Sequence, residues 1–171
     1  MRYRMMMVIL ATVLLFSGQA LAADMKIGYV DVKSAIENTK AYRDGLKRLE
    51  GMKNQKQKEL SGLRDKITKA EKDLFNQSMA MSPDMASRKK QDLNDLKKQF
   101  QRKQQDARES LMMEKNRLDQ GVLRKFYDSV RAYGKSHHYD MILPTSSIIY
   151  GADGHDITSK VTQALDKGDS K

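Results

Sequence analysis

The sequence predicts a mostly helical α+β protein in which a long antiparallel helical hairpin projects from a small β-rich body. Two observations lead to this fold class. A narrow apolar stripe at coiled-coil spacing runs through residues 34–133, with one helix-breaking segment, Ser82-Pro83-Asp84, near its middle. Strand-like segments lie near the ends of the chain. Because 39% of the residues are hydrophobic and 32% are charged, a large aromatic-cored enzyme is disfavoured.

Residues 1–22 have the organisation of a cleaved export signal. Arg2 and Arg4 precede an uncharged run from Met5 to Phe16, and Ala20-Leu21-Ala22 supplies small residues at a cleavage site. The run is shorter than the roughly 20 apolar residues that span a bilayer. No Cys follows it that could carry a lipid. The sequence therefore predicts an exported chain whose mature part has no transmembrane segment; a membrane anchor is the alternative.

Two segments, residues 23–33 and 134–171, are predicted to form the β-rich body with a C-terminal helix. Lys26–Val32 has the pattern of a strand that is apolar on both faces. Tyr139–Leu143 and Ser147–Tyr150 have the pattern of two more strands, separated by the turn residues that follow Leu143.

The predicted body is too small to cover its own apolar surface. Asp156 is suited to cap the last helix, on which Ile157, Val161 and Leu165 share one face. A core of fewer than about 40 residues usually needs outside help, so we expect self-association; burial alone leaves a dimer or a trimer open. The residues expected to form the oligomerisation body are Ile27, Tyr29, Val30, Val32, Met141, Ile142, Leu143, Ile148, Ile149 and Tyr150.

Residues 34–133 are predicted to form the hairpin arm. Ser34 and Glu37 have the spacing of a capping box at its start. Ser82, Pro83 and Asp84 have the preferences of an N-cap, a first helical residue and an acidic first turn, so the tip is expected near residues 77–84. The first helix would then run without interruption for about 45 residues, or roughly 65 Å.

The apolar stripe of each half of the hairpin is interrupted by a polar segment, near residues 54–58 and 101–105. Folding the chain about residue 80 places the two interruptions opposite each other. A polar layer loosens a coiled coil, so we expect a hinge halfway along the arm; chance composition is the alternative. The residues expected at the hinge are Lys56, Gln57, Lys103 and Gln104.

The net charge of +10 is concentrated on the arm. Residues 40–120 carry 21 Lys or Arg and 13 Asp or Glu, a net charge of +8, whereas the rest of the mature chain carries nine of each. Solubility explains charges of both signs but not this excess. An excess of one sign indicates long-range attraction of an anionic partner.

Catalysis, a cofactor and a metal site are not expected. The chain has no Cys, which excludes disulfides, thiolate zinc sites and Cys nucleophiles. His137 and His138 are adjacent, so on a helix they would point about 100° apart. The sequence has no Gly-rich phosphate loop, no G-x-S-x-G and no H-E-x-x-H. Specific nucleic-acid binding is also not expected, because the chain carries an export signal and no groove-reading motif; any affinity should be nonspecific and salt-sensitive.

The mature chain resembles the Skp/OmpH family of periplasmic chaperones over essentially its whole length. The specific parts are the opening KIGYVDV, at residues 26–32, and the closing YDMILPTSSIIYGADGHDITSKV, at residues 139–161. The arm matches in its basic, coiled-coil character more than in its letters. The resemblance implies a periplasmic homotrimer with a β-barrel body and tentacle-like arms. It also implies an ATP-independent holdase that encloses unfolded outer-membrane proteins and keeps them soluble for delivery.

The residues of the arm suit a holdase of this kind. Exposed ionic contacts are worth about 0–1 kcal/mol each, so many of them give avidity with rapid exchange. Methionines at the tip are flexible and suit variable partners, although packing of the turn is the alternative. The residues expected to bind clients are Met79, Met81, Met85, Arg88, Lys89, Lys90, Lys97 and Lys98.

Three other roles remain as alternatives to a chaperone. The Arg88-Lys89-Lys90 cluster can meet lipopolysaccharide or anionic lipid, although an ordinary solvated basic turn is the favoured interpretation. A noncatalytic envelope spacer would need no client, and it would give the arm no reason to be basic. A nonspecific polyanion binder would use the same charge without a folding role.

Overall fold

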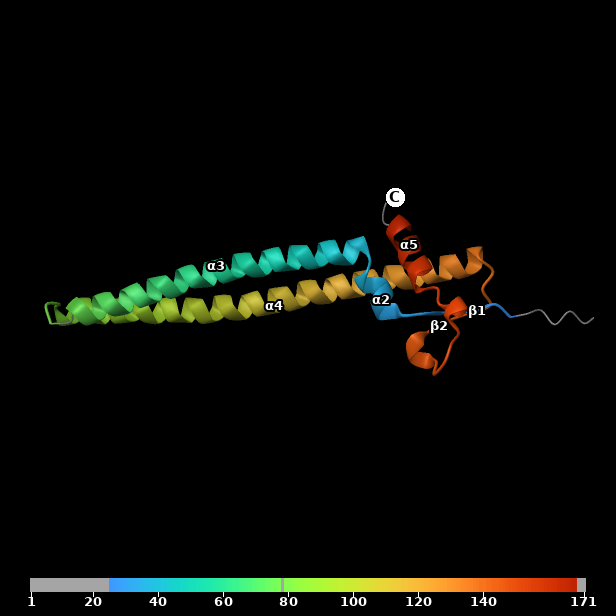
Figure 1. The fold of residues 1–171 in the computed structure, drawn as a ribbon. Helices are drawn as coiled ribbons and strands as arrows, with labels where there is room; N and C mark the ends of the chain where they lie inside the picture. Colours follow the sequence, from blue (N-terminus) through green and yellow to red (C-terminus); the bar gives the residue numbers. More distant parts are fainter. Residues whose placement is uncertain (1–24, 78, 169–171) are drawn as a thin grey trace, which may run out of the picture.

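The computed structural model describes residues 25–77 and 79–168. Two long helices lie side by side, and a small body sits at one end (Figure 1). The predicted leader and the last three residues lie outside the described part. The elements are β1 (Ile27–Val30), α2 (Val32–Glu37), α3 (Lys40–Gln77), α4 (Pro83–Ser136), β2 (Met141–Pro144), the 3₁₀ turns η1 (Thr145–Ser147) and η2 (Asp153–His155), and α5 (Thr158–Gly168).

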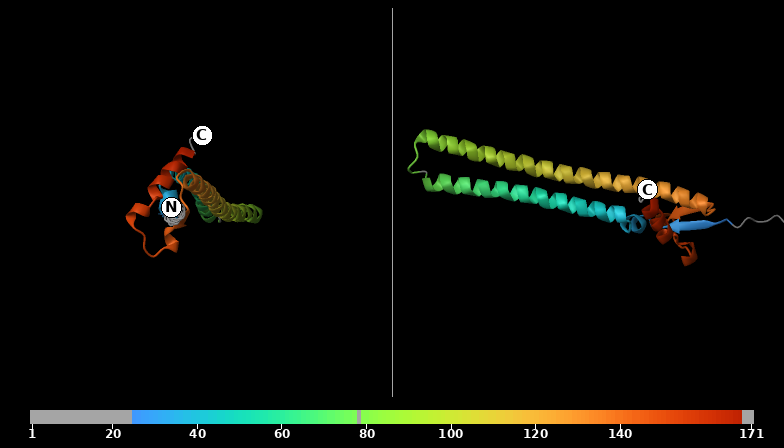
Figure 2. Two further views of the ribbon diagram at one scale, coloured as in Figure 1. Left: turned by 90° about the vertical axis from the view of Figure 1, so that its right-hand side faces the viewer. Right: turned by 90° about the horizontal axis from the view of Figure 1, so that it is seen from above.

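The helical hairpin and its tip are confirmed. The side chain of Ser82 accepts a hydrogen bond from the backbone N–H of Met85 at 3.3 Å, Pro83 opens α4 and Asp84 lies in its first turn. α3 has 38 residues and α4 has 54, so at 1.5 Å per residue they are about 57 and 81 Å long. The extra length of α4 carries it past the start of α3 and into the body (Figure 2).

The start of the arm differs from the prediction in two ways. The capping box at Ser34 and Glu37 is wrong, because Asp31 is the N-cap of α2 and its carboxylate accepts from the backbone N–H of Ser34 at 3.0 Å. The uninterrupted first helix is also wrong, because the chain turns at Asn38 and Thr39 before α3 begins. The buried Thr39 hydroxyl donates to the Ile36 carbonyl at 2.7 Å and accepts from the backbone N–H of Tyr42 at 3.2 Å.

The sheet of the described chain has two parallel strands. β1 pairs with β2 so that Ile27 faces Met141 and Val30 faces Pro144, and one isolated bridge joins Tyr29 to Asp156. The first strand ends at Val30, so Val32 lies in α2 and not in the predicted strand. The other predicted strand, Ser147–Tyr150, is wrong: Ser147 ends a 3₁₀ turn, and Ile149 and Tyr150 are exposed. An apolar β-branched run still needs a strand beside it to pair with, and within the described chain this segment has none.

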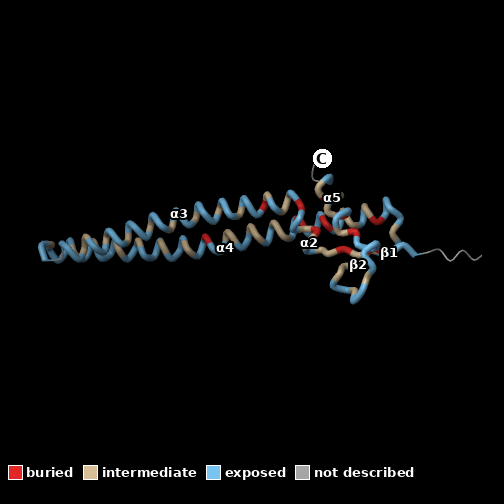
Figure 3. The backbone as a smooth tube through the Cα atoms, in the orientation of Figure 1, coloured by how far each residue is buried: buried red, intermediate tan, exposed pale blue. Residues whose placement is uncertain are grey.

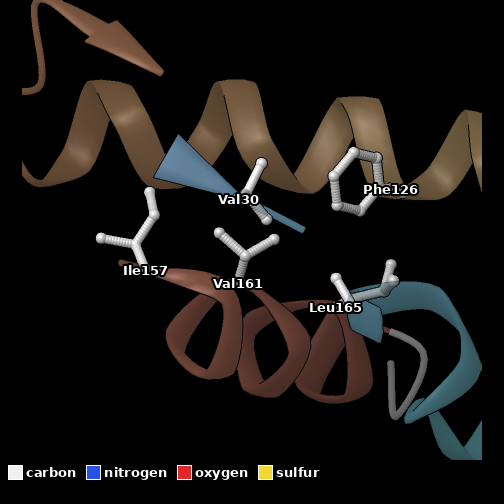
Figure 4. Close-up of a cluster of buried hydrophobic side chains, with 6 residues drawn as sticks. Val30, Phe126, Ile157, Val161 and Leu165 are labelled. Atoms are coloured by element: carbon white, nitrogen blue, oxygen red, sulfur yellow. The ribbon is translucent and has the colours of Figure 1, made fainter. Parts of the chain in front are cut away.

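The hydrophobic core lies where α2, α4, α5 and β1 meet. It consists of Val30, Ala35, Phe126, Ile157, Val161 and Leu165. Figure 4 shows the side chains of Val161 and Leu165 on α5, and of Ile157 directly before it, on the side of Val30 and Phe126. The predicted buried face of the last helix is therefore confirmed. Asp156 caps the start of this helix, because its carboxylate accepts from the backbone N–H of Thr158 at 2.8 Å. Buried residues gather at this end of the molecule, whereas most of the arm surface is exposed (Figure 3).

Candidate functional site

The arm offers an extended surface whose tip carries the predicted methionines. Met79 lies in the turn between the helices, where its side chain is 101% exposed. Met85, in the first turn of α4, is 54% exposed, and Met81 is half-buried. Packing of the turn therefore explains why a methionine stands at Met81, which is half-buried. It does not explain the methionine at Met79, which is fully exposed. The turn presents flexible apolar side chains to solvent, which is the property expected of a surface with varied partners.

The basic residues near the tip divide into engaged and free side chains. Lys89 donates to the Gln77 side chain across the hairpin at 2.8 Å, and Lys97 pairs with Glu71 at 2.7 Å. Lys98 lies 3.8 Å from Asp95 on its own helix. Arg88 and Lys90, in contrast, are exposed, and among the described residues neither has a carboxylate within 4.0 Å. These two side chains are the part of the predicted cluster best placed to meet an anionic partner.

The base of the arm is held by a polar contact between its helices. The Lys115 ammonium donates to the Asp119 carboxylate at 2.6 Å and to the Tyr42 hydroxyl at 3.4 Å. The hydrogen bond to Asp119, helped by Tyr42, raises the pKa of Lys115 against the opposing effect of burial. Tyr42 belongs to α3 and Lys115 to α4, so this contact joins the two helices near the body.

The cross-arm contacts correct the predicted alignment of the two polar segments. Gly45 packs against Leu118, the Arg64 guanidinium lies 5.7 Å from the centre of the Phe100 ring, and Glu71 pairs with Lys97. The midpoints of these pairs lie between residues 81 and 84, and not at residue 80. The polar segments are therefore staggered by about one helical turn and do not face each other.

The stagger changes what surrounds each predicted hinge residue. Lys56 and Gln104 are half-buried, whereas Gln57 and Lys103 are exposed. Extending the alignment of Gly45 with Leu118 along the arm would put Lys56 opposite the buried Ala107, and Gln104 opposite the half-buried Leu60. In this alignment each polar side chain stands opposite an apolar one, where a second apolar side chain would complete the packing between the helices. A mid-arm hinge stays a prediction, and it now covers two adjacent helical turns of the arm, one at Lys56 and one at Gln104.

Sequence reasoning missed several exposed apolar side chains on the base of α4. Met112 and Met113 follow the stripe residue Leu111 directly, and Leu123 and Tyr127 lie three residues before and one residue after the core residue Phe126. All four lie outside the stripe that joins the helices. The doubled methionine beside Leu111 was the available signal, because one narrow stripe cannot bury three consecutive apolar residues.

A shallow groove between α3 and α4 lies close to this surface. It has a volume of about 420 Å³. Arg48, Arg117 and Lys125 contribute its positive charge, and Glu114 contributes a carboxylate. Gly45 and Gly121 line it as well. Within residues 25–168, leaving aside residue 78, no three His, Cys, Asp or Glu side chains gather in a way that could hold a metal ion.

Known proteins share this sequence pattern and this architecture. The family model described as Outer membrane protein (OmpH-like) matches residues 26–165. The chain belongs to the OmpH-like family. The Chaperone protein Skp of Vibrio cholerae is 24% identical over 147 residues, which cover 85% of this chain and 86% of that protein. The crystal structure of an OmpH-like protein from Caulobacter crescentus has a TM-score of 0.77 at 19% identity, covering 90% of each chain.

The body of the OmpH-like chain has apolar side chains on its surface as well as in its core. Of the residues predicted for oligomerisation, Val30 is buried, and Ile27, Met141, Ile149 and Tyr150 are exposed. The remaining five, Tyr29, Val32, Ile142, Leu143 and Ile148, are half-buried.

The hydroxyl of Tyr29 lies among polar groups of the body. It lies 3.5 Å from the Gly151 carbonyl. Partial burial raises the pKa of Tyr29, and the carboxylates of Asp156 and Asp153 raise it further. In the described part of the OmpH-like chain, no helix combines the length and hydrophobicity that crossing a bilayer requires.

Proposed function

We propose that this chain is a periplasmic holdase that keeps unfolded outer-membrane proteins soluble between its arms without ATP. The observation that carries the proposal is the arm, a two-helix projection with a net charge of +8 over residues 40–120 and exposed methionines at its tip. Membership of the OmpH-like family and the likeness to a protein named Chaperone protein Skp support the same role.

The arm binds by many weak contacts under this proposal. Arg88 and Lys90 attract acidic segments of a client, and Met79 and Met85 contact its apolar side chains. Each exposed ionic contact contributes about 0–1 kcal/mol and is screened by salt, so no single contact traps the client. The sum of many such contacts retains it, while each one exchanges rapidly.

We also propose that three copies of the chain assemble through the body. Ile149 and Tyr150 are fully or largely exposed although both carry large apolar surfaces, and Met141 on β2 is 44% exposed. Side chains of this kind are stabilised when a second copy covers them. A trimer would bring three arms around one space, in which an unfolded chain could be enclosed.

The proposal is tested with the protein purified after export. An acidic outer-membrane barrel protein unfolded in urea is diluted into it without ATP, and light scattering is followed at low and at moderate salt. We expect suppression of aggregation at about one oligomer per client, weakened by salt. Suppression of aggregation that does not change with salt would show that apolar contacts, and not charges, hold the client. No suppression at any ratio would overturn the holdase and favour an envelope spacer.

Two double variants test which positive charges of the arm contribute to client binding. Arg88→Gln with Lys90→Gln removes two cations that have no carboxylate within 4.0 Å among the residues that the structure describes. Lys47→Gln with Lys53→Gln removes two that already face Asp44 and Glu50. We expect the first pair to weaken client binding more than the second. Vesicles of anionic lipid tested with the same variants check the proposed lipid contact of the Arg88-Lys89-Lys90 cluster.

A further inference from the structure

We propose that Met79, Met81 and Met85, here called the tip methionines, are an oxidation-sensitive modification site that lowers client affinity when hydroperoxide converts them to sulfoxides. The inference rests on the proposed function, because it assigns a regulation to the surface that holds the client. It adds that this surface has two chemical states, of which one binds apolar segments and the other does not.

The tip methionines are open to a soluble oxidant. Met79 is 101% exposed and Met85 is 54% exposed, so their sulfur atoms need no local unfolding to be reached. The chain has no Cys, whose thiolate would otherwise react ahead of a thioether. Oxidising equivalents that reach this protein are therefore directed to methionine, and first to the exposed ones.

The reaction is a two-electron oxygen transfer. The thioether sulfur attacks the terminal oxygen of a hydroperoxide, an S–O bond forms as the O–O bond breaks, and water or an alcohol leaves with the proton. The sulfur is oxidised and the peroxide is reduced. The product is methionine sulfoxide, which sulfoxide reductases convert back to methionine. The modification is therefore reversible.

Oxidation of the exposed Met79 and Met85 changes the tip surface without breaking the hydrogen bonds that hold the turn. The turn is held by the Ser82 side chain, which accepts from the backbone N–H of Met85, and by the hydrogen bond from Lys89 to Gln77. Neither bond uses a sulfur atom. The arm should stay helical while its tip exchanges flexible apolar side chains for polar ones.

The positive charge of the arm is unaffected by the modification. Arg88 and Lys90 keep their charge after oxidation, so binding that remains is mostly electrostatic. An oxidised arm should therefore bind acidic clients more weakly and with a steeper dependence on salt than the reduced arm. This change in salt dependence separates loss of the apolar contact from general damage.

The experiment compares three proteins purified after export. One is the unchanged chain, one carries Met79→Leu, Met81→Leu and Met85→Leu, and the matched control carries Met112→Leu and Met113→Leu at the base. Met112 and Met113 are 60% and 65% exposed, so they oxidise readily too. Each protein is treated with hydrogen peroxide, which catalase then removes. Peptide mass spectrometry locates the sulfoxides, circular dichroism checks the helices, and client affinity is measured before and after treatment at two salt concentrations.

We expect peroxide to lower the client affinity of the unchanged chain by about tenfold, with a steeper salt dependence and no loss of helix. The base variant should lose affinity by the same ratio, whereas the ratio for the tip variant should stay near one. Equal losses in all three proteins, or unchanged affinity with sulfoxides found at the tip, would overturn the switch. A chain that holds no client before peroxide is added fails at an earlier step, and it would overturn the proposed function itself.

Discussion

Gly45 and Leu118 approach so closely that a Cβ atom at residue 45 would lie 2.3 Å from one methyl carbon of Leu118. The two residues join α3 to α4 near the body, beside the Tyr42, Lys115 and Asp119 contact. Helices can approach this closely only where one of them lacks a side chain. The pair therefore sets the spacing of the arm at its base.

Replacing Gly45 with Val should destabilise the arm by about 1–3 kcal/mol, because the new side chain forces Leu118 or the helix to move. Urea unfolding followed by circular dichroism measures the change. Gly51→Val is the matched control, since Gly51 lies in the same helix with no atom within 4 Å of its would-be Cβ. If the two substitutions have the same effect on stability, the loss at residue 45 does not come from the contact with Leu118.

The turn between α2 and α3 depends on one buried hydroxyl. Replacing Thr39 with Ala removes its bonds to Ile36 and Tyr42 and should cost about 1–2 kcal/mol. Thr39→Ser should recover most of this stability, because it keeps the hydroxyl. Thr68→Ala provides the comparison at an exposed helical site, where little change is expected. Thermal unfolding at a fixed protein concentration distinguishes the three.

The cap at Asp31 should make stability depend on pH in the acid range. Hydrogen bonds from the backbone and side chain of Ser34 hold the pKa of Asp31 below its ordinary value of 3.8. A carboxyl with a lowered folded pKa stabilises the protein above 3.8, and this stabilisation is lost as the pH falls through the lower folded value.

Asp31→Asn should remove this pH dependence while keeping a capping side chain. The free energy of unfolding of the unchanged chain and of the variant should therefore differ most above pH 3.8 and converge as the pH falls through the lower folded pKa of Asp31. A constant difference across the whole acid range would show that the charge of Asp31 is not the cause.

The exposed apolar pair of the body should matter to assembly more than to folding. Ile149→Asp with Tyr150→Ser replaces side chains that are 107% and 86% exposed, so the separate chain should lose little stability. Sedimentation velocity should show a smaller species than the unchanged protein. If the unchanged protein sediments as a single chain, or the variant keeps its assembly, the proposed body interface is wrong.

The mid-arm hinge can be tested by hydrogen exchange. Amides near Lys56 and Gln104 should exchange faster than those near Leu63 and Leu96, because polar side chains interrupt the packing there. Equal protection along the arm would refute the hinge. Replacing Lys56 with Leu should slow amide exchange near residue 56 without changing the fold. The exchange rates near Leu96 should stay the same.

Much of the fold could be predicted because its signals are local. Ser82, Pro83 and Asp84 end one helix and start another whatever surrounds them, and Ile157, Val161 and Leu165 mark a buried face by spacing alone. The cap at Asp31 and the turn at Thr39 were missed because the apolar pattern runs on through both. Polar residues with capping preferences were present there, but spacing favoured a continuous helix.

The surface could be predicted less well because exposure depends on how the helices are rotated. The sequence identified the tip methionines, but it did not show that Met79 is fully exposed and Met81 only half so. It also placed the two polar segments opposite each other, and the contact between Arg64 and Phe100 shows that they are offset. Only contacts between elements fix such an alignment.

The pairing of β1 with β2 sets the order in which the chain can fold. Ile27 pairs with Met141, and most of the chain between them is the arm. Closing so long a loop is entropically costly, whereas the hairpin forms from contacts close to its own turn. The arm can therefore become helical from its tip first. The body forms only when the C-terminal segment, with β2 and α5, pairs with β1. A chain that folds from the unfolded state would pass through a stage with a formed arm and an open body.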